Sequence, residues 1–214
     1  METFNEIKSR QFQAMLEPAQ DKLKKYSPED ICKKANITYN ESEKTFCIQS
    51  MGKNIFVHYP DFVVEQSLEM WHHLTLLQYM DTADGAPLTG RWKSLQQMRG
   101  SFARGSGFDK DIGIMFERYF SDITEEEFRS ACERLGGVVV DGKADVSVII
   151  PYAPMFKVLV NFWEGDDEFP ASGKVLVDEN AEHYLEIEAA GGACSAVIME
   201  IKKNLPAKAE FEIL

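Results

Sequence analysis

Residues 145–185 read DVSVIIPYAPMFKVLVNFWEGDDEFPASGKVLVDENAEHYL, and this stretch decides the fold. Its apolar runs predict three strands, at Asp145–Tyr152, Met155–Trp163 and Lys174–Asp178, with Ala153-Pro154 as the first turn. Alternate residues of the middle strand place aromatic and branched apolar side chains on one side of it. We therefore expect an antiparallel meander that carries helices on at least that face.

The flanking residues extend this pattern. Val138–Val140 adds a fourth strand to the meander, and Glu210–Leu214 is a candidate edge strand. Thr124 and Glu127 have the spacing of a capping box, which predicts a helix start at that point. Four segments are expected to be helical: Asp109–Phe120, Thr124–Leu135, Asn180–Leu185 and Glu188–Asn204.

The N-terminal half changes from helical to alternating periodicity and back. Helical spacing up to about Lys25 predicts one bent helix or two, because Pro18 interrupts it. A second short helix should run from the Ser27-Pro28 start to Ala35, and a central helix should cover Val64–Met80. Three hairpin-linked strands are expected between these helices: Ile37–Asn40, Lys44–Met51 and Asn54–Tyr59. Residues 81–108 show no sustained period and are predicted as a long ordered loop with short helical pieces.

The predicted fold class is therefore α+β, with two antiparallel β-meanders packed with helices. The two meanders could instead be continuous as one mixed sheet. The 214 residues suit a single α+β domain spanning 1–214, with an N-terminal subdomain at 1–60 as the alternative.

Charge and cysteine content exclude several classes of protein. Lys and Arg total 23 against 35 Asp and Glu, a formal charge of -12, which repels nucleic acid and anionic membranes. No secretion signal or membrane-spanning run is present, so we expect a cytoplasmic protein. The four cysteines are far apart, which disfavours a zinc site, an iron–sulfur cluster or a disulfide framework.

Three phrases resemble a known family. LLQYMDTADGAPLTGRW, GSFARGSGF and FWEGDDEFPASGKVLVDENAEHYL are similar to an uncharacterised prokaryotic family, domain of unknown function 3786. The resemblance covers about Phe56 to Lys203. Such proteins occur chiefly in anaerobic bacteria and archaea, and the resemblance implies no established activity. Some relatives carry an additional iron–sulfur cluster segment, but this chain lacks the clustered cysteines such a segment needs.

The glycine-rich loop before the Asp109 helix is the main candidate ligand site. Its backbone amides and the helix N-terminus could hold a phosphate or carboxylate, with two arginines as counter-charges. The predicted ligand-binding residues are Trp92, Arg99, Gly100, Arg104, Gly105 and Gly107. Neither nucleotide-binding fingerprint is complete, and a flexible connection is the alternative.

Two segments are candidate metal sites, and each has a simpler structural alternative. The acidic connection Glu164, Asp166, Asp167 and Glu168 could coordinate Ca²⁺ or Mg²⁺, although a solvated turn is favoured. Glu69 and His72 have the Glu-x-x-His spacing of a di-iron bundle, but the second motif and further glutamates are missing. We expect no metal site, and the residues identify no cofactor.

Three functions are consistent with these observations. The first is a cytoplasmic small-molecule-binding or accessory protein of anaerobic metabolism, with a small anion as ligand. The second is a small enzyme whose anionic substrate is held by Arg99 and Arg104. The third is a structural interaction module with a protein partner or a second copy of itself. No catalytic signature decides whether the chain is an enzyme.

Overall fold

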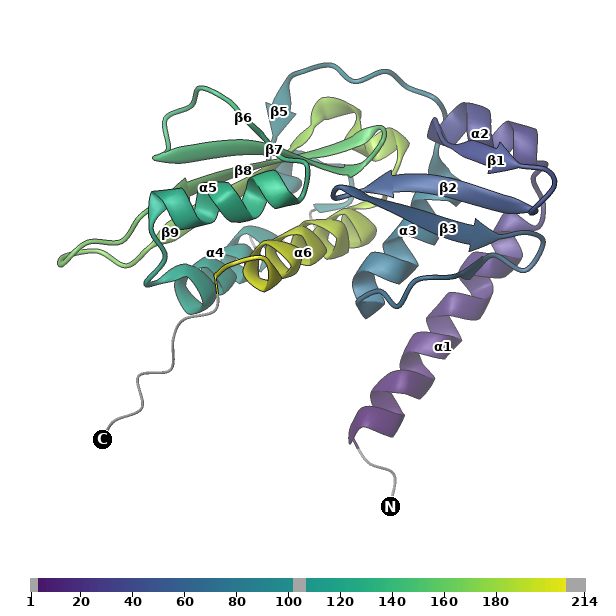
Figure 1. Ribbon diagram of the computed structural model, residues 1–214, viewed down its shortest axis with the longest axis horizontal. Coiled ribbons are helices and arrows are strands. Elements are labelled where there is room, and N and C mark those ends of the chain that lie inside the picture. Colours follow the sequence, from purple (N-terminus) through teal and green to yellow (C-terminus); the bar gives the residue numbers. More distant parts are fainter. Residues whose placement is uncertain (1–3, 102–106, 207–214) are drawn as a thin grey trace.

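The computed structural model describes residues 4–101 and 107–206. These residues form two antiparallel sheets, in strand orders β1-β2-β3-β4 and β5-β9-β8-β7-β6, together with six α-helices (Figure 1). The predicted α+β class is confirmed. The meanders are two separate sheets, so the mixed-sheet alternative does not hold.

The N-terminal sheet is built from hairpins. Its strands are β1 (Thr38–Asn40), β2 (Thr45–Ser50), β3 (Lys53–His58) and β4 (Val63–Val64). Met51 and Gly52 both have positive φ, 46° and 74°, which matches the right-handed twist of a two-residue hairpin turn. The first three strands lie within one or two residues of the predicted positions.

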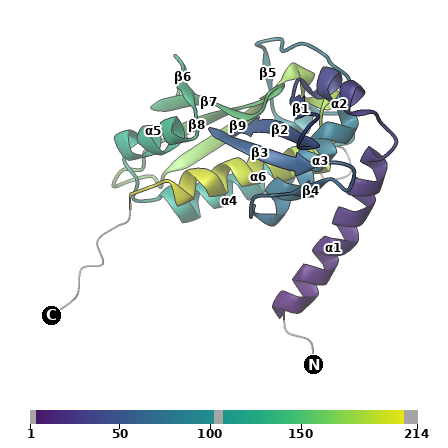
Figure 2. The same ribbon diagram turned by 45° about the vertical axis from the view of Figure 1, so that its right-hand side comes forward.

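Three helices accompany this sheet: α1 (Phe4–Leu23), α2 (Pro28–Ala35) and α3 (Met70–Thr82). The α1 helix continues through Pro18 as one helix, and its N-terminal end extends away from the body of the protein in Figures 1 and 2. Ser27 begins α2 as predicted, since its hydroxyl accepts a hydrogen bond from the Asp30 backbone N–H at 3.2 Å.

The predicted Val64–Met80 helix starts too early. Val63 and Val64 pair with His58 and Val57 as a fourth strand, so backbone pairing takes residues whose spacing also suits a helix. The helix begins after Glu69, whose carboxylate accepts hydrogen bonds from the backbone N–H groups of Trp71 and His72.

The C-terminal sheet contains β6 (Val138–Val139), β7 (Val146–Ala153), β8 (Phe156–Trp163) and β9 (Ser172–Asp178). These four strands confirm the second predicted meander. A short strand that was not predicted, β5 (Trp92–Lys93), pairs with the far edge of β9 inside the expected loop.

Helices cover one face of this sheet. They are α4 (Gly107–Phe120), α5 (Glu125–Arg134) and α6 (Ile187–Lys203), with 3₁₀ turns at η1 (Leu95–Gln97) and η3 (Glu179–His183). All three α-helices lie on the same side of β7–β9 in Figures 1 and 2. Phe128 of α5 stacks on Phe162 of β8, with ring centroids 4.2 Å apart. The expected helix-covered face is therefore confirmed, whereas the predicted Glu210–Leu214 strand lies outside the described residues.

The two sheets join at their hairpins. The Met51 backbone N–H donates to the Pro151 carbonyl oxygen at 2.9 Å, which links the β2–β3 turn to β7. Gly52 packs so closely on the end of α5 that an added Cβ would lie 3.2 Å from the Leu135 carbonyl carbon. Buried apolar residues of both sheets belong to the same core. In the described part of the chain, no helix is both long and apolar enough to cross a bilayer.

Candidate functional site

The predicted glycine-rich site is described only at its two ends. Arg99 carries a side chain that is 94% exposed, and its Nε lies 3.5 Å from a Glu182 carboxylate oxygen. The Arg99 backbone N–H also donates to Glu182. Burial opposes ionisation of Glu182, but hydrogen bonds and charges from Arg99 and Lys93 outweigh it and lower the Glu182 pKa. Arg99 is thus paired with Glu182, an acidic residue of η3.

The remaining predicted residues are dispersed. Gly100 is exposed with a φ of 82°, and Gly107 is the first residue of α4. Trp92 is half-buried on β5, where it lies opposite Asp178. Arg104 and Gly105 lie outside the described residues.

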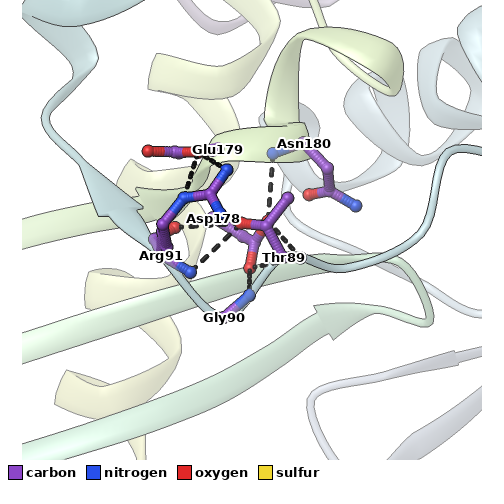
Figure 3. Close-up of polar contacts among 6 residues, drawn as sticks. All are labelled: Thr89, Gly90, Arg91, Asp178, Glu179 and Asn180. Carbon is purple, nitrogen blue, oxygen red and sulfur yellow. Dashed lines mark hydrogen bonds and ion pairs between the residues drawn. The ribbon is translucent and has the colours of Figure 1, made fainter.

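Asp178 is the centre of a polar cluster beside this region (Figure 3). Its side chain is buried, and it accepts hydrogen bonds from the backbone N–H groups of Thr89, Gly90 and Asn180 at 2.7–3.2 Å. The Thr89 hydroxyl donates a further hydrogen bond at 2.9 Å. Arg91 pairs with Glu179 at the edge of the cluster, at 2.6 Å. A buried carboxylate with four donors is satisfied, so Asp178 fixes the 89–91 segment onto β9.

Further contacts join the same two segments of the chain. The His183 imidazole and the Asp84 carboxylate lie 2.6 Å apart, and the Tyr184 hydroxyl donates to the Ala86 carbonyl at 2.6 Å. The hydrogen bond from His183 is the main cause of a lowered pKa at Asp84. Two of the phrases that carry the family resemblance, LLQYMDTADGAPLTGRW and FWEGDDEFPASGKVLVDENAEHYL, therefore contact each other in space. Polar side chains of both phrases form hydrogen bonds that join the two segments.

Two carboxylates of the acidic connection between β8 and β9 make structural contacts. A Glu164 carboxylate oxygen accepts from the Glu125 backbone N–H at 2.6 Å, at the start of α5. Asp166 accepts from the backbone N–H groups of Phe169 and Glu168, and these bonds lower its pKa. Asp167 and Glu168 are exposed. Among the residues the structure describes, no group of three or more His, Cys, Asp or Glu could hold a metal ion.

The Glu-x-x-His pair has two separate roles. Glu69 caps α3, accepting from the backbone N–H groups of Trp71 and His72. The buried His72 ring instead reaches the N-terminal sheet, where its Nε2 lies 2.8 Å from the Ser50 hydroxyl. Burial lowers the His72 pKa to about 4, so the ring is neutral at neutral pH.

A pocket of about 270 Å³ lies where the two sheets join. Its lining includes two cross-strand pairs, Gln49 opposite Asn54 in β2–β3 and Pro151 opposite Lys157 in β7–β8. Pro154 adds to the wall beside the β7–β8 turn. We call this the inter-sheet pocket.

Lys157 is the unusual group in the inter-sheet pocket. It is half-buried, and this burial lowers the pKa of its amine. Within residues 4–101 and 107–206, no carboxylate lies within ion-pair distance of it. Lys53, which also lines the pocket, is by contrast paired with Glu200 at 3.2 Å. Lysine that is desolvated without a partner is rare in ordinary packing and marks a candidate functional group.

The sequence contains one signal for this site. Lys157 is the only charged residue between Val146 and Trp163, in a segment that otherwise reads as sheet core. Gln49 and Asn54 give no such signal, because polar residues are ordinary near a hairpin turn. Their approach to Lys157 depends on how the two sheets join, which periodicity does not determine.

Fold and site together define an α+β protein with two antiparallel sheets and a polar pocket at their junction. A model of the family described as a domain of unknown function (DUF3786) matches residues 27–200, and the chain belongs to this family. This confirms the resemblance found in the sequence. No curated protein and no solved structure matches the chain.

Proposed function

We propose that this protein binds a small anion in the inter-sheet pocket. The observation that supports the proposal is the half-buried amine of Lys157, which has no carboxylate partner in the described part of the chain. Gln49 and Asn54 line the same pocket and carry carboxamide N–H donors. One ammonium and two amides are suitable donors for a carboxylate or phosphate.

Electrostatics favour a local site over a general attraction for anions. With a formal charge of -12, the protein as a whole repels anions, so binding has to come from short-range donors. Desolvation makes the charged form of Lys157 costly, and a bound anion would offset that cost. The volume of about 270 Å³ lies just below the ~300–1,000 Å³ of drug-sized ligand pockets, which favours a small metabolite.

The test is ligand-dependent thermal stability at low ionic strength. Phosphate and acetate should raise the melting temperature of the wild type and should have little effect on Lys157→Gln. Lys143→Gln is the matched control, because it removes the same charge from an exposed loop. Equal responses of the two variants would rule out the inter-sheet pocket.

A second measurement needs no ligand. The unfolded chain accepts a proton on Lys157 more readily than the folded chain does, so the charged amine reduces stability at neutral pH. Lys157→Met should therefore be at least as stable as the wild type in urea unfolding at pH 7. A clear loss of stability would indicate that Lys157 serves packing instead.

The glycine-rich loop is an alternative anion site. In the small-enzyme hypothesis, the same loop holds the anionic substrate. A double variant, Arg99→Ala with Arg104→Ala, tests it in the same assay. If this variant loses the response to phosphate and Lys157→Gln keeps it, the anion binds at the loop.

The biological setting we propose is accessory to anaerobic metabolism in the cytoplasm. Its support is the family resemblance. A protein partner or a second copy of the chain remains an alternative role. Size-exclusion chromatography with light scattering tests self-association.

A further inference from the structure

The reactive form of a lysine depends on its surroundings. An amine attacks a carbonyl carbon only through its free lone pair, which a protonated or ion-paired lysine does not offer. Lys53 and Lys157 line the same pocket but differ in their partners. Lys53 lies 3.2 Å from the Glu200 carboxylate, whereas Lys157 has no carboxylate at that range among the described residues.

The residues around Lys157 in the pocket wall leave its amine without a carboxylate partner in the described chain. Pro151 lies opposite Lys157 in the sheet, and Pro154 is in the turn before β8, so these two neighbours carry no charge. The glycines Gly52 and Gly136 also line the pocket, and Gly52 packs closely on the end of α5. The lowered pKa that burial gives Lys157 agrees with this geometry.

The other polar groups of the wall select the ligand. Gln49 and Asn54 lie opposite each other across β2 and β3, and both line the same pocket as the lysine. They can donate to a carboxylate without competing for the proton of the amine. A ligand that satisfies both sides of the pocket carries a carboxylate next to a carbonyl group.

We infer that Lys157 captures the carbonyl carbon of a short 2-oxo acid as a reversible imine, while Gln49 and Asn54 hold its carboxylate. This inference rests on the anion pocket proposed above and names its ligand class. The capture needs no metal, cofactor or redox partner.

The reaction balances in two steps. First, the lone pair of Nζ forms a bond to the carbonyl carbon, the C=O π electrons move to oxygen, and a proton shifts from nitrogen to that oxygen. Second, nitrogen donates its lone pair as the C–O bond breaks, and the oxygen leaves as water with a second proton from nitrogen. The net change is amine plus oxo acid to imine plus water, and hydrolysis reverses it.

The experiment traps the imine. Full-length protein is incubated with pyruvate in an amine-free buffer, reduced with cyanoborohydride, and analysed by intact mass and peptide mapping. One adduct is expected on Lys157, with the added mass of pyruvic acid less one oxygen. Lys157→Arg should lower the yield at least about tenfold, a change equivalent to ~1.4 kcal/mol. Lys53→Arg is the control within the pocket and should keep the adduct, and circular dichroism checks that both variants fold.

Several results would overturn the inference. Equal labelling of many lysines, or unchanged labelling of Lys157→Arg, would show that Lys157 has no special reactivity. Equal labelling by acetaldehyde, which lacks a carboxylate, would remove the assigned role of Gln49 and Asn54. A Lys157-dependent response to phosphate and acetate without any adduct would refute imine formation but leave the anion pocket standing. Absence of both signals would refute the two proposals together.

Discussion

Replacing His72 with glutamine should change how stability depends on pH. His72 is only 3% exposed, and burial lowers its pKa from 6.5 to about 4. Between those two values the unfolded chain holds a proton on this ring that the folded chain does not. Stability is therefore lost as pH falls from 6.5 to 4, and the ring makes no such contribution above pH 7.

The size of the effect follows from the two pKa values. A difference of about 2.5 units corresponds to about 3 kcal/mol in full, at ~1.4 kcal/mol per unit. At pH 4.5 most of it is expressed, about 2.5 kcal/mol by linkage. Against this, His72→Gln weakens the 2.8 Å contact with Ser50, which should cost ~0.5–1.5 kcal/mol at neutral pH.

The assay is urea unfolding of wild type and variant, followed by tryptophan fluorescence at pH 7.5, 6, 5 and 4.5. His72→Gln should be less stable than the wild type at pH 7.5 and as stable or more stable at pH 4.5. His73, whose pKa burial also lowers, is present in both proteins and cancels. His58→Gln is the control for losing an exposed histidine. A difference between wild type and His72→Gln that stays constant over this pH range would refute the reasoning.

Three further predictions concern the fold. Asp178→Ala should lower the free energy of unfolding by about 2–4 kcal/mol, because it leaves donors of Thr89, Gly90 and Asn180 unpaired. Urea unfolding measures this loss, with Asp141→Ala at an exposed position as the control. Gly52→Ala should cost at least about 1 kcal/mol more than Gly90→Ala in the same measurement. Both glycines have φ near +70°, but an added Cβ meets the Leu135 backbone only at Gly52, so equal losses would contradict the packing argument. In the native protein iodoacetamide should label Cys32 and Cys47 well before the buried Cys132 and Cys194. Burial raises the pKa of the Cys194 thiol to about 12 and also raises that of Cys132. Early labelling of Cys132 or Cys194 would show that the core opens.

The fold was predictable where local chemistry and tertiary packing agree. Alternating apolar residues and short turns predict the hairpins of both sheets, β2–β3 and β7–β8 among them. The capping box at Thr124 is present as expected, with hydrogen bonds in both directions to Glu127. These signals act over a few residues, so one sequence suffices to see them.

The errors fall where distant residues decide the local structure. Val63 and Val64 became a strand because β3 offers them a pairing edge, although their spacing also suits α3. Trp92 and Lys93 form β5 because Asp178 anchors the preceding Thr89–Gly90 turn on β9. Neither partner can be identified from periodicity within the segment itself.

The contrast between Asp178 and Lys157 separates structure from function in this protein. Asp178 belongs to one of the phrases that resemble the family, yet four donors already satisfy its carboxylate, so it has little capacity left for a ligand. Lys157 belongs to a segment that reads as ordinary core, yet its amine is half-buried without a carboxylate partner in the described chain. Folding alone does not favour such an arrangement, because a methionine of similar length would fill the same space without the desolvation cost. An unmet interaction beside a pocket is therefore better support for a binding role than a distinctive motif whose groups bind one another.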